Sequence, residues 1–405
     1  MIETRYMYKN SYTESFKQFA SKDYLRRKKL EIKRVKKGLV LPLKVSEAGG
    51  PLLGYGGVLD SNGEYVMESA QIGKGGTADR FVGKYDFDPH KVVYSDEEVI
   101  YIGALPLHWG HFLVDMVYRF WVFNDIQNEN KKIVYCANGQ NFKGPQLEFI
   151  KMLGIDEKRL FRIDKPTCFK EVDVPEPAYM ACDYYTIDYR NIFTRVVNNL
   201  DSISLQSYEK IYLSRGHFRK AKRSEIGEKH IEDNFLRNGF HVLYMEELSL
   251  KEQIFYITSS KVIAALSGTL CHNIMFANPN TTLILLNKTH LINTHQVLIN
   301  QAVGCKVVYV DVYKEPFKKF PKSYGSGPFL LEEDSLEKYF VDQGMKIKKK
   351  PFYMRWNDFA RYVYVCIRQS MQEKMEQLYS DIYHWTCRHP FIINKLRLLK
   401  KVVYR

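Results

Sequence analysis

The sequence predicts an α/β protein made of two halves, each with a parallel sheet, followed by a helical extension. Three observations support this fold class. Short apolar segments alternate with longer amphipathic segments, as parallel strands joined by crossover helices require. Hydrophobic residues make up 45% of the chain and charged residues 26%, which is typical of a globular protein. The 405 residues also exceed the size of one ordinary domain and suit two.

The first half is expected to end near residue 200. Residues 1–40 are basic and are predicted to be helical, and a Ser-Asn-Gly turn between apolar runs at 56–67 indicates a hairpin. Beyond the hairpin, apolar runs predict strands and amphipathic runs predict helices. The strands are expected at 99–102, 132–136, 160–163 and 172–174, and the helices at 108–125, 146–153 and 187–200.

The second half alternates more regularly. Its strands are expected at 210–214, 240–244, 261–265, 282–286 and 306–311, and its helices at 225–238, 249–259, 270–277 and 290–302. This order predicts a parallel sheet with right-handed crossovers. A turn-rich linker at 317–328 then leads to the helical extension. The predicted units are 1–48, 49–200, 201–316 and 317–405, of which the first and last are basic and helical.

Several classes of protein are not expected. No apolar run approaches the roughly 18 residues that a membrane-spanning helix needs. The first ten residues lack the apolar segment of a signal peptide. The seven cysteines include no Cys-x-x-Cys pair, so they are expected to be reduced thiols of a cytosolic protein, with no disulfide frame or zinc site.

The net charge of +14 is concentrated at the two ends of the chain. Residues 1–50 have eight more basic than acidic side chains, and residues 344–405 have ten more. This distribution favours a polyanionic partner, either an anionic membrane surface or nucleic acid. Nucleic acid is not expected, because the chain lacks the known nucleic-acid-binding motifs. The stretch 384–401 mixes apolar residues with cations, so it could lie in a membrane interface or pack on the body as an ordinary basic helix.

The first candidate site is a polar stripe on the predicted helix at 108–125. His111, Asp115 and Arg119 are spaced four residues apart and would share one helical face. An imidazole, a carboxylate and a guanidinium could together deprotonate a hydroxyl or hold a phosphate. The alternative is an ordinary ion pair between residues four apart.

A second candidate site follows the strand at 210–214. Ser214 and Arg215 begin a cationic loop that continues through Arg219, at the carboxyl end of a strand, where two Rossmann-like halves would bind ligands in a shared cleft. Arginine binds phosphate oxygens through two parallel hydrogen bonds, so this loop predicts an anion site. The alternative is a solvated basic loop.

Two further segments lie at predicted strand ends. Gly268 and Thr269 form a turn before a helix, whose backbone N–H groups could bind a diphosphate. Glu247 could accept hydrogen bonds from ribose hydroxyls, and the nearby Ser249-x-x-Glu252 spacing predicts a helix capping box. The remaining histidines, His295 among them, lack the spacing of metal ligands and are treated as structural. No metal site is predicted.

Taken in order, these segments resemble glycosyltransferase family 61 over about residues 50–315. The similarity is carried by Gly110-His111-Phe112 with Asp115 and Arg119, Leu213-Ser214-Arg215 with Arg219, Glu246-Glu247-Leu248-Ser249 with Gln253, and Gly268 through Asn273. The chain differs from the family at one turn, where Ser267-Gly268-Thr269 replaces the usual His-Gly-Ala. His272 lies nearby in the sequence.

The resemblance implies a GT-B fold, with an acceptor side at 49–200 and a nucleotide-sugar domain at 201–316. It implies inverting transfer, from a UDP-sugar as the favoured donor, to a polysaccharide or lipid-linked glycan, with no cofactor and no essential metal. A role in capsule or surface-polysaccharide synthesis, in the cytoplasm or on the inner face of the plasma membrane, fits a chain without an anchor. The alternative is a degenerate, non-catalytic relative that binds glycan or membrane as a scaffold.

The site residues that this reading predicts fall into two groups. The catalytic group is His111, Asp115 and Arg119. The donor-binding group is Ser214, Arg215, Arg219, Glu247, Gly268, Thr269, His272 and Asn273.

Overall fold

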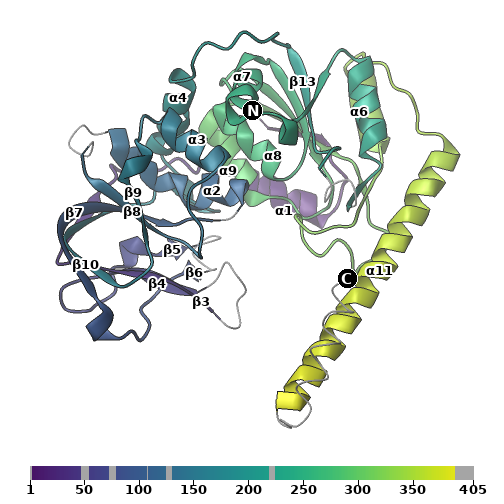
Figure 1. Ribbon diagram of the computed structural model, residues 1–405. Helices are drawn as coiled ribbons and strands as arrows, with labels where there is room; N and C mark the ends of the chain where they lie inside the picture. Colours follow the sequence, from purple (N-terminus) through teal and green to yellow (C-terminus); the bar gives the residue numbers. More distant parts are fainter. Residues whose placement is uncertain are drawn as a thin grey trace.

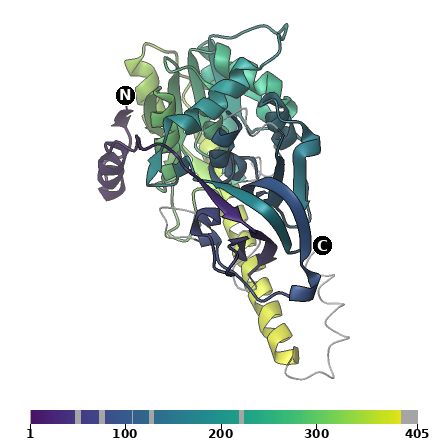
Figure 2. The same ribbon diagram turned by 90° about the vertical axis from the view of Figure 1, so that its left-hand side faces the viewer.

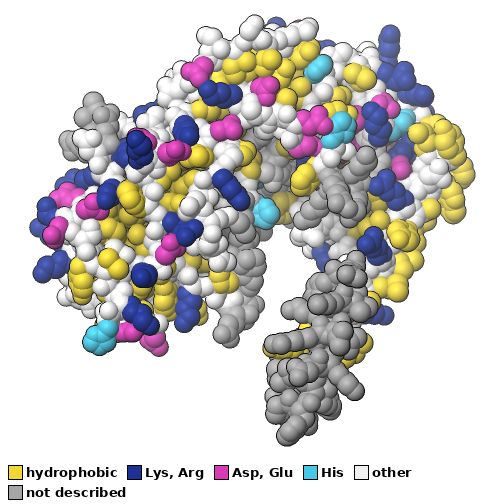
Figure 3. Space-filling model, in the orientation of Figure 1, with side chains coloured by type: hydrophobic (Ala, Val, Ile, Leu, Met, Phe, Trp, Pro, Cys, Tyr) yellow, Lys and Arg dark blue, Asp and Glu magenta, His cyan; other side chains and the backbone are white. Residues whose placement is uncertain are grey.

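The computed structural model describes residues 2–46, 54–72, 79–106, 108–124, 130–218 and 224–387. Two sheet-containing lobes lie side by side, and one long helix, α11 (Phe352–Cys387), extends away from them (Figure 1). The sheet of the first lobe is built from strands between residues 32 and 175, and that of the second lobe from residues 2–6 and from strands between residues 210 and 311. Seen from the side, α11 again extends away from the body of the molecule (Figure 2). On the face shown in Figure 3, apolar, basic and acidic side chains are intermixed over the described surface.

The second lobe contains a six-stranded parallel sheet in the order β1-β18-β17-β16-β13-β15. The strands are β1 (Ile2–Tyr6), β13 (Lys210–Ser214), β15 (His241–Tyr244), β16 (Val262–Leu266), β17 (Thr282–Asn287) and β18 (Lys306–Asp311). The five strands predicted between 210 and 311 are confirmed, because each is a short apolar run that the sheet buries. Their order reverses between β13 and β16, and ligands of such sheets bind in the crevice at that point.

Helices cover both faces of this sheet. They are α6 (Glu228–Arg237), α7 (Leu250–Ser259), α8 (Thr269–His272) with the 3₁₀ turn η8 (Asn273–Phe276), and α9 (Thr294–Val303). The helix predicted at 270–277 is therefore one α-helical turn continued by a 3₁₀ turn. The other three predicted helices are confirmed with shorter bounds.

The first lobe contains a nine-stranded sheet that is mixed, where a parallel sheet was predicted. Strands β10, β7, β8 and β9 pair in parallel, whereas β2, β3 and β4 add antiparallel pairs. The strands are β2 (Ile32–Lys36), β3 (Leu39–Val45), β4 (Gly54–Leu59), β5 (Gln71–Ile72), β6 (Asp79–Phe81), β7 (Val93–Ala104), β8 (Lys132–Cys136), β9 (Leu160–Ile163) and β10 (Thr167–Pro175). The predicted hairpin is present as a turn after β4, where the Val66 N–H donates to the Val58 carbonyl at 2.9 Å.

The helices of the first lobe face the second lobe (Figure 1). They are α2 (Trp109–Asp115), the 3₁₀ segment η4 (Val117–Asn124), α3 (Pro145–Met152) and α4 (Ile187–Asn198). A short hairpin of β11 (Tyr179–Met180) and β12 (Tyr184–Tyr185) precedes α4. The single helix predicted at 108–125 is wrong, because the α-helix ends at Asp115 and its continuation is 3₁₀.

The prediction that residues 1–48 form a helical unit is also wrong. Of the described residues in this range, 2–46, only those of α1 (Ser11–Ala20) form a helix. Strand β1 joins the sheet of the second lobe by parallel pairing with β18, and β2 joins the first lobe by antiparallel pairing with β10. The N-terminal segment therefore belongs to both lobes. Its short runs of β-branched and aromatic residues form strands because the lobes supply strand edges to pair with.

One apolar core runs through both lobes. The ring centroids of Phe149 and Phe276 lie 6.3 Å apart, and those of Phe193 and Phe276 lie 5.5 Å apart. Phe149 and Phe193 belong to the first lobe and Phe276 to the second, and all three are buried. The contact between the lobes is therefore part of the hydrophobic core, so the relative position of the lobes is fixed there.

The chain after the second sheet forms the helical extension that was predicted, with α10 (Asp334–Asp342) and then α11. The predicted linker at 317–328 connects β19 (Tyr313–Lys314) to β20 (Phe329–Leu331), and these two strands form a small sheet with β14 (Glu225–Ile226). None of the described helices combines the length and the apolar character needed to cross a membrane. Most of the predicted interfacial stretch, from residue 388 onward, lies outside the described residues.

Candidate functional site

Helix α2 meets the start of α8 where the two lobes touch. A Cβ atom built on Gly110 would lie 2.9 Å from Thr269 Cγ2, 3.0 Å from Thr269 Oγ1 and 3.4 Å from His272 Cδ2. Real Cβ atoms do not approach other atoms as closely as the first of these distances, so only glycine allows this contact. The segment with Gly110-His111 and the turn with Gly268-Thr269 are therefore brought together, as the sequence predicted.

The first two residues of the predicted stripe form a hydrogen-bonded pair. His111 Nδ1 lies 2.8 Å from Asp115 Oδ2 across one turn of α2. The Asp115 side chain is 4% exposed, whereas that of His111 is 28% exposed. The buried carboxylate therefore orients an imidazole that reaches the surface. The Asp115 carbonyl also accepts a hydrogen bond from Gln71 Nε2 at 2.8 Å, which holds the end of α2.

Arg119 does not share the stripe with His111 and Asp115. The turn into 3₁₀ geometry at Met116 rotates the following residues, and Arg119 is fully buried. Its guanidinium donates to the carbonyl of Ala70 at 3.0 Å and to that of Pro175. The prediction that Arg119 steadies Asp115 or reaches a phosphate is therefore corrected: it ties η4 to β10 and to the segment before β5.

His272 lies behind the pair as a neutral imidazole. Its Nδ1–H donates to Gln296 Oε1 at 2.8 Å. Burial, followed by the charge of His295, lowers the pKa of His272 to about 4. His111 and Asp115 also act on the pKa of His272 through their charges, so His272 lies within electrostatic reach of the pair. A histidine this hard to protonate can orient a partner but cannot carry a positive charge near neutral pH.

A histidine and a tyrosine that the sequence did not single out complete the group. His295 Nδ1 lies 2.7 Å from the hydroxyl of Tyr179, and the rings of His272 and His295 lie 6.3 Å apart between centroids. Burial, then Tyr189 and Asp115, raises the pKa of Tyr179. Tyr179 lies in β11 and His295 at the start of α9, so only the fold brings them together. No spacing in the sequence could have found them.

Asn273 is a bridge between motifs and is not exposed to a ligand. Trp109 Nε1 donates to Asn273 Oδ1 at 2.7 Å, and Asn273 Nδ2 donates to Gln253 Oε1 at 3.3 Å. Gln253 in turn donates to the carbonyls of Met245 and Leu248. Asn273 is 1% exposed, so three of the sequence motifs form one hydrogen-bonded chain across the lobes. Its predicted role in donor binding is corrected to a positioning role.

The loop after β13 is held by carboxylates. Ser214 Oγ bonds Glu232 Oε1 and accepts from the Gly216 N–H, and Ser214 is fully buried. Arg215 Nη1 lies 3.5 Å from Glu225 Oε1. Both predicted residues are thus engaged by acidic groups, and Ser214 has no exposed surface to offer a ligand. Arg219 lies outside the described residues.

Glu247 lies at the end of β15, as predicted. Its Oε1 is 2.6 Å from His217 Nδ1, and its side chain is 57% exposed. The predicted capping box is confirmed, because the Ser249 and Glu252 side chains each bond the other's backbone N–H. Gly268 has φ = 145°, a conformation that side-chain-bearing residues rarely adopt, so this turn needs glycine.

The described residues contain no group of three or more His, Cys, Asp or Glu arranged to hold a metal ion. The site residues predicted from the sequence lie in two separate places in the structure. His111, Asp115, Thr269 and His272 gather at the junction of the lobes. Ser214, Arg215 and Glu247 lie around the carboxyl ends of β13 and β15.

The architecture, with a Rossmann-like parallel sheet and a histidine–carboxylate pair at the lobe junction, is consistent with a Rossmann-like glycosyltransferase. The family model described as Glycosyltransferase 61 matches residues 109–284, from the first residue of α2 into β17. This match supports the resemblance to glycosyltransferase family 61 that the sequence motifs indicate. The matched segment contains the pair, the Arg215 loop and the Asn273 bridge. No curated protein matches the chain.

Proposed function

We propose that this protein is an inverting glycosyltransferase with a GT-B-like arrangement of its two lobes. It moves a sugar from a nucleotide-sugar, with UDP as the favoured nucleotide, to a polysaccharide or a lipid-linked glycan. The role is in capsule or surface-polysaccharide synthesis. The match to family 61 supports the transfer of a sugar, and the His111–Asp115 hydrogen bond is the observation that carries the proposed mechanism.

In this mechanism His111 takes the proton of the acceptor hydroxyl. Its Nδ1 is committed to Asp115, so proton transfer runs through Nε2. The buried Asp115 fixes the ring orientation and stabilises the imidazolium that forms, which is the role of the carboxylate in a histidine-based catalytic triad. The deprotonated hydroxyl then attacks the anomeric carbon from the face opposite the nucleotide, which inverts the configuration.

The departing diphosphate would be stabilised without an essential metal. Arg215, Arg219 and the backbone N–H groups after Gly268 are the groups proposed for this role. Arg215 and the Gly268 turn follow β13 and β16, on either side of the point where strand order reverses, and that placement supports a donor site there. Arg215 would exchange part of its contact with Glu225 for the phosphate.

Thermal shift with UDP, GDP, CDP, CMP and ADP, each with and without EDTA, tests the donor site. Stabilisation by one nucleotide is expected to persist in EDTA and to disappear in Arg215→Ala. At about 100 times Kd the stabilisation approaches about 2.7 kcal/mol, which is readily measured. Stabilisation that EDTA abolishes would contradict metal independence.

The pair itself is tested by Asp115→Asn, with Asp96→Asn on the exposed part of β7 as the matched control. The readout is nucleoside diphosphate released with the donor that thermal shift identifies. Asp115→Asn is expected to keep nucleotide binding and lose about 10²–10⁴-fold in rate. Equal rates in Asp115→Asn and the control would contradict the role of the pair.

The alternative function is a non-catalytic scaffold. The Ser267-Gly268-Thr269 turn and the full engagement of Asn273 by Trp109 and Gln253 favour it. No stabilisation by any nucleotide, in a protein that still binds glycan or membrane, would support this alternative and contradict the transferase.

We further propose contact with an anionic membrane through the helical extension. Exposed apolar side chains line the outer part of α11, and residues 388–405 contain six basic and no acidic residues. The apolar set includes Trp356, Ile367, Met371 and Leu378. Binding to anionic vesicles should fall as salt rises, whereas salt-insensitive binding or none would contradict the proposal.

A further inference from the structure

A pocket of about 590 Å³ lies beside the carboxyl ends of β13 and β15, apart from the His111–Asp115 pair. Its inner wall comes from the turn after β13 and from the start of α6, and its outer wall comes from the first turns of α11. Neither the Gly268 turn nor any residue of α2 lines it. The pocket is therefore a separate feature of the second lobe.

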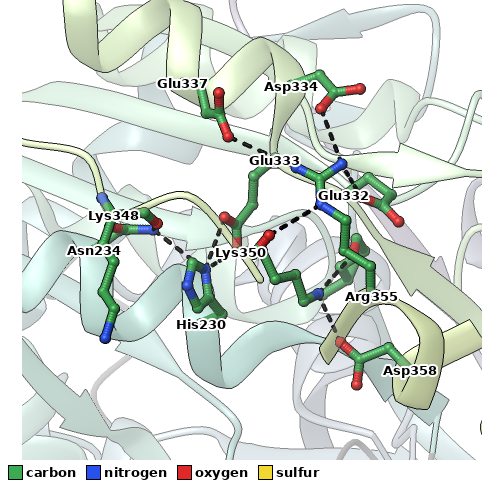
Figure 4. A network of polar contacts seen from close by, with 11 residues as sticks. His230, Asn234, Glu332, Glu333, Asp334, Glu337, Lys348, Lys350, Arg355 and Asp358 are labelled. Carbon is green, nitrogen blue, oxygen red and sulfur yellow. Dashed lines mark hydrogen bonds and ion pairs between the residues drawn. The ribbon is translucent and has the colours of Figure 1, made fainter. Parts of the chain in front are cut away.

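The α11 side of the pocket is firmly anchored. Lys350 Nζ donates to Asp358 Oδ2 at 2.6 Å, and the Lys350 side chain is 2% exposed (Figure 4). A Cβ atom built on Gly227 would lie 2.8 Å from that Nζ, so glycine makes room for the lysine. Arg355 adds ion pairs from α11 to Glu332 and to α10 (Figure 4). The two walls are thus held at a fixed separation.

Two polar atoms in the inner wall have no hydrogen-bond partner among the described residues. They are Glu225 Oε2 and His230 Nε2, and their residues are 5% and 8% exposed. The other polar atoms of these side chains are engaged: Glu225 Oε1 accepts from Lys288 Nζ at 2.5 Å, and His230 Nδ1 bonds Glu333 at 2.7 Å (Figure 4). An unpaired buried polar atom costs about 1–3 kcal/mol, so both atoms favour a polar occupant.

The charges of the wall decide what kind of occupant fits. Burial would raise the pKa of Glu225, but Lys288 and Arg215 hold it below its usual value, so Glu225 is ionised. Burial, followed by the charges of Glu225 and Glu232, raises the pKa of Glu228 to about 8, so Glu228 carries a proton at neutral pH. The wall therefore offers a carboxylate acceptor and a carboxyl donor side by side.

The charges of the pocket wall disfavour both an anionic and a cationic occupant. A phosphate would face the ionised Glu225 and the carboxylates that surround it. The nearby lysines are already paired: Lys229 with Glu232 and Asp233, Lys288 with Glu225, and Lys350 with Asp358. A cation would face these same lysines. Hydroxyl groups, which both donate and accept, suit the wall because they can bond Glu225 and Glu228 together.

We propose that this pocket binds an uncharged, hydroxyl-rich group, with Glu225 Oε2 accepting from one hydroxyl and His230 Nε2 bonding a second. The stacked rings of His217 and Tyr244, 3.6 Å apart between centroids, line the same pocket and give it an aromatic surface. The group is either the ribose of the donor nucleotide, which rests on the proposed function, or a sugar unit of a glycan, which does not.

Saturation-transfer NMR on the full chain tests this site with two sets of probes. The first probe is uridine, which has the ribose and no phosphate. The second set is neutral sugars: glucose, galactose, N-acetylglucosamine and xylose. Asn357→Trp places an indole in the outer wall, and Met354→Trp does so one turn away. Met371→Trp, on the exposed face of the same helix, is the matched control.

At least one uncharged probe is expected to bind the wild type and Met371→Trp, and to bind at least tenfold more weakly in Asn357→Trp or Met354→Trp. If uridine is the only probe that binds the pocket, the group is the ribose. If a neutral sugar binds the pocket, the group is a glycan unit. The proposal would be overturned if no uncharged probe bound the wild type. It would also be overturned if pyrophosphate displaced the bound probe, or if the probe bound the pocket variants as tightly as the wild type. Asp115→Asn should keep this binding, so failure of the pocket and failure of the catalytic pair are distinguishable.

Discussion

The buried neutral His272 makes the stability of the protein depend on pH in a defined window. Its pKa is about 4 in the folded state, against about 6.5 for an unfolded histidine. Between pH 6.5 and pH 4, His272 is therefore mostly protonated in the unfolded chain and mostly neutral in the folded protein. Stability is fully present above pH 6.5 and is lost as pH falls toward 4.

The size of the effect follows from the difference of 2.5 units. At about 1.36 kcal/mol for each unit, His272 alone removes about 3 kcal/mol of unfolding free energy between pH 6.5 and pH 4. The replacement His272→Asn cannot take up a proton in this range, and its amide N–H can still donate to Gln296. Other titrating groups contribute equally to both proteins and cancel in the comparison.

The assay is urea unfolding at intervals of half a pH unit from pH 4 to pH 8. The curve of unfolding free energy against pH should be flatter for His272→Asn than for the wild type by about 3 kcal/mol over the window. His90→Asn, which replaces an exposed histidine, should run parallel to the wild type. Parallel curves for all three proteins would refute the burial of a neutral imidazole at this position.

Three further substitutions test the contacts that hold the site. Gly110→Val should lower the unfolding free energy by about 1–3 kcal/mol, because its side chain would overlap Thr269; unchanged urea unfolding would refute the close contact of α2 and α8. Arg119→Met should cost at least about 2 kcal/mol in the same assay, because two buried carbonyls lose their donors, and a neutral result would return Arg119 to the candidate ligand-binding residues. Ser249→Ala should lower stability by about 1 kcal/mol through the loss of the capping box with Glu252, which a small decrease in Tm measures.

The second sheet could be predicted from the sequence because burial on both faces leaves a plain signal. Strands such as β13 and β18 are short apolar runs bounded by polar turns, and their predicted bounds match the structure. The helices between them carry an amphipathic pattern that fixes their type, though not their ends. The local sequence was sufficient here because the hydrophobic pattern of each strand and helix matches the way in which the fold buries it.

The N-terminal segment could not be predicted in the same way. Strand β1 is stabilised by pairing with β18, about 300 residues away in the sequence, and β2 by pairing with β10, about 140 residues away. Arg5 in β1 and Lys33, Arg34 and Lys36 in β2 are exposed, and these basic residues obscure the short apolar pattern. A basic composition therefore suggested a helix, whereas tertiary pairing decided for strands.

The candidate site shows the same division. His111 and Asp115 could be found because one turn of helix separates them, and that spacing survives in the structure. Arg119 follows at the same spacing, yet the switch to 3₁₀ geometry after Asp115 turns it into the core. Tyr179 and His295 meet only through the fold, so no sequence pattern contains their contact.

The residues of the first motif divide into those that position and those that react. Gly110 lets α2 touch Thr269, and Trp109 bonds Asn273 across the same junction, so these residues fix α2 against the second lobe. His111 is the next residue of α2, and the core that the two lobes share fixes its position. Catalytic geometry of this kind needs placement within a fraction of an ångström, which a contact in the hydrophobic core supplies and a hinge does not. Any movement that admits the substrates is therefore expected outside this contact. The matched family segment begins at Trp109, which helps to place the pair, so positioning belongs to this motif as much as the chemistry does.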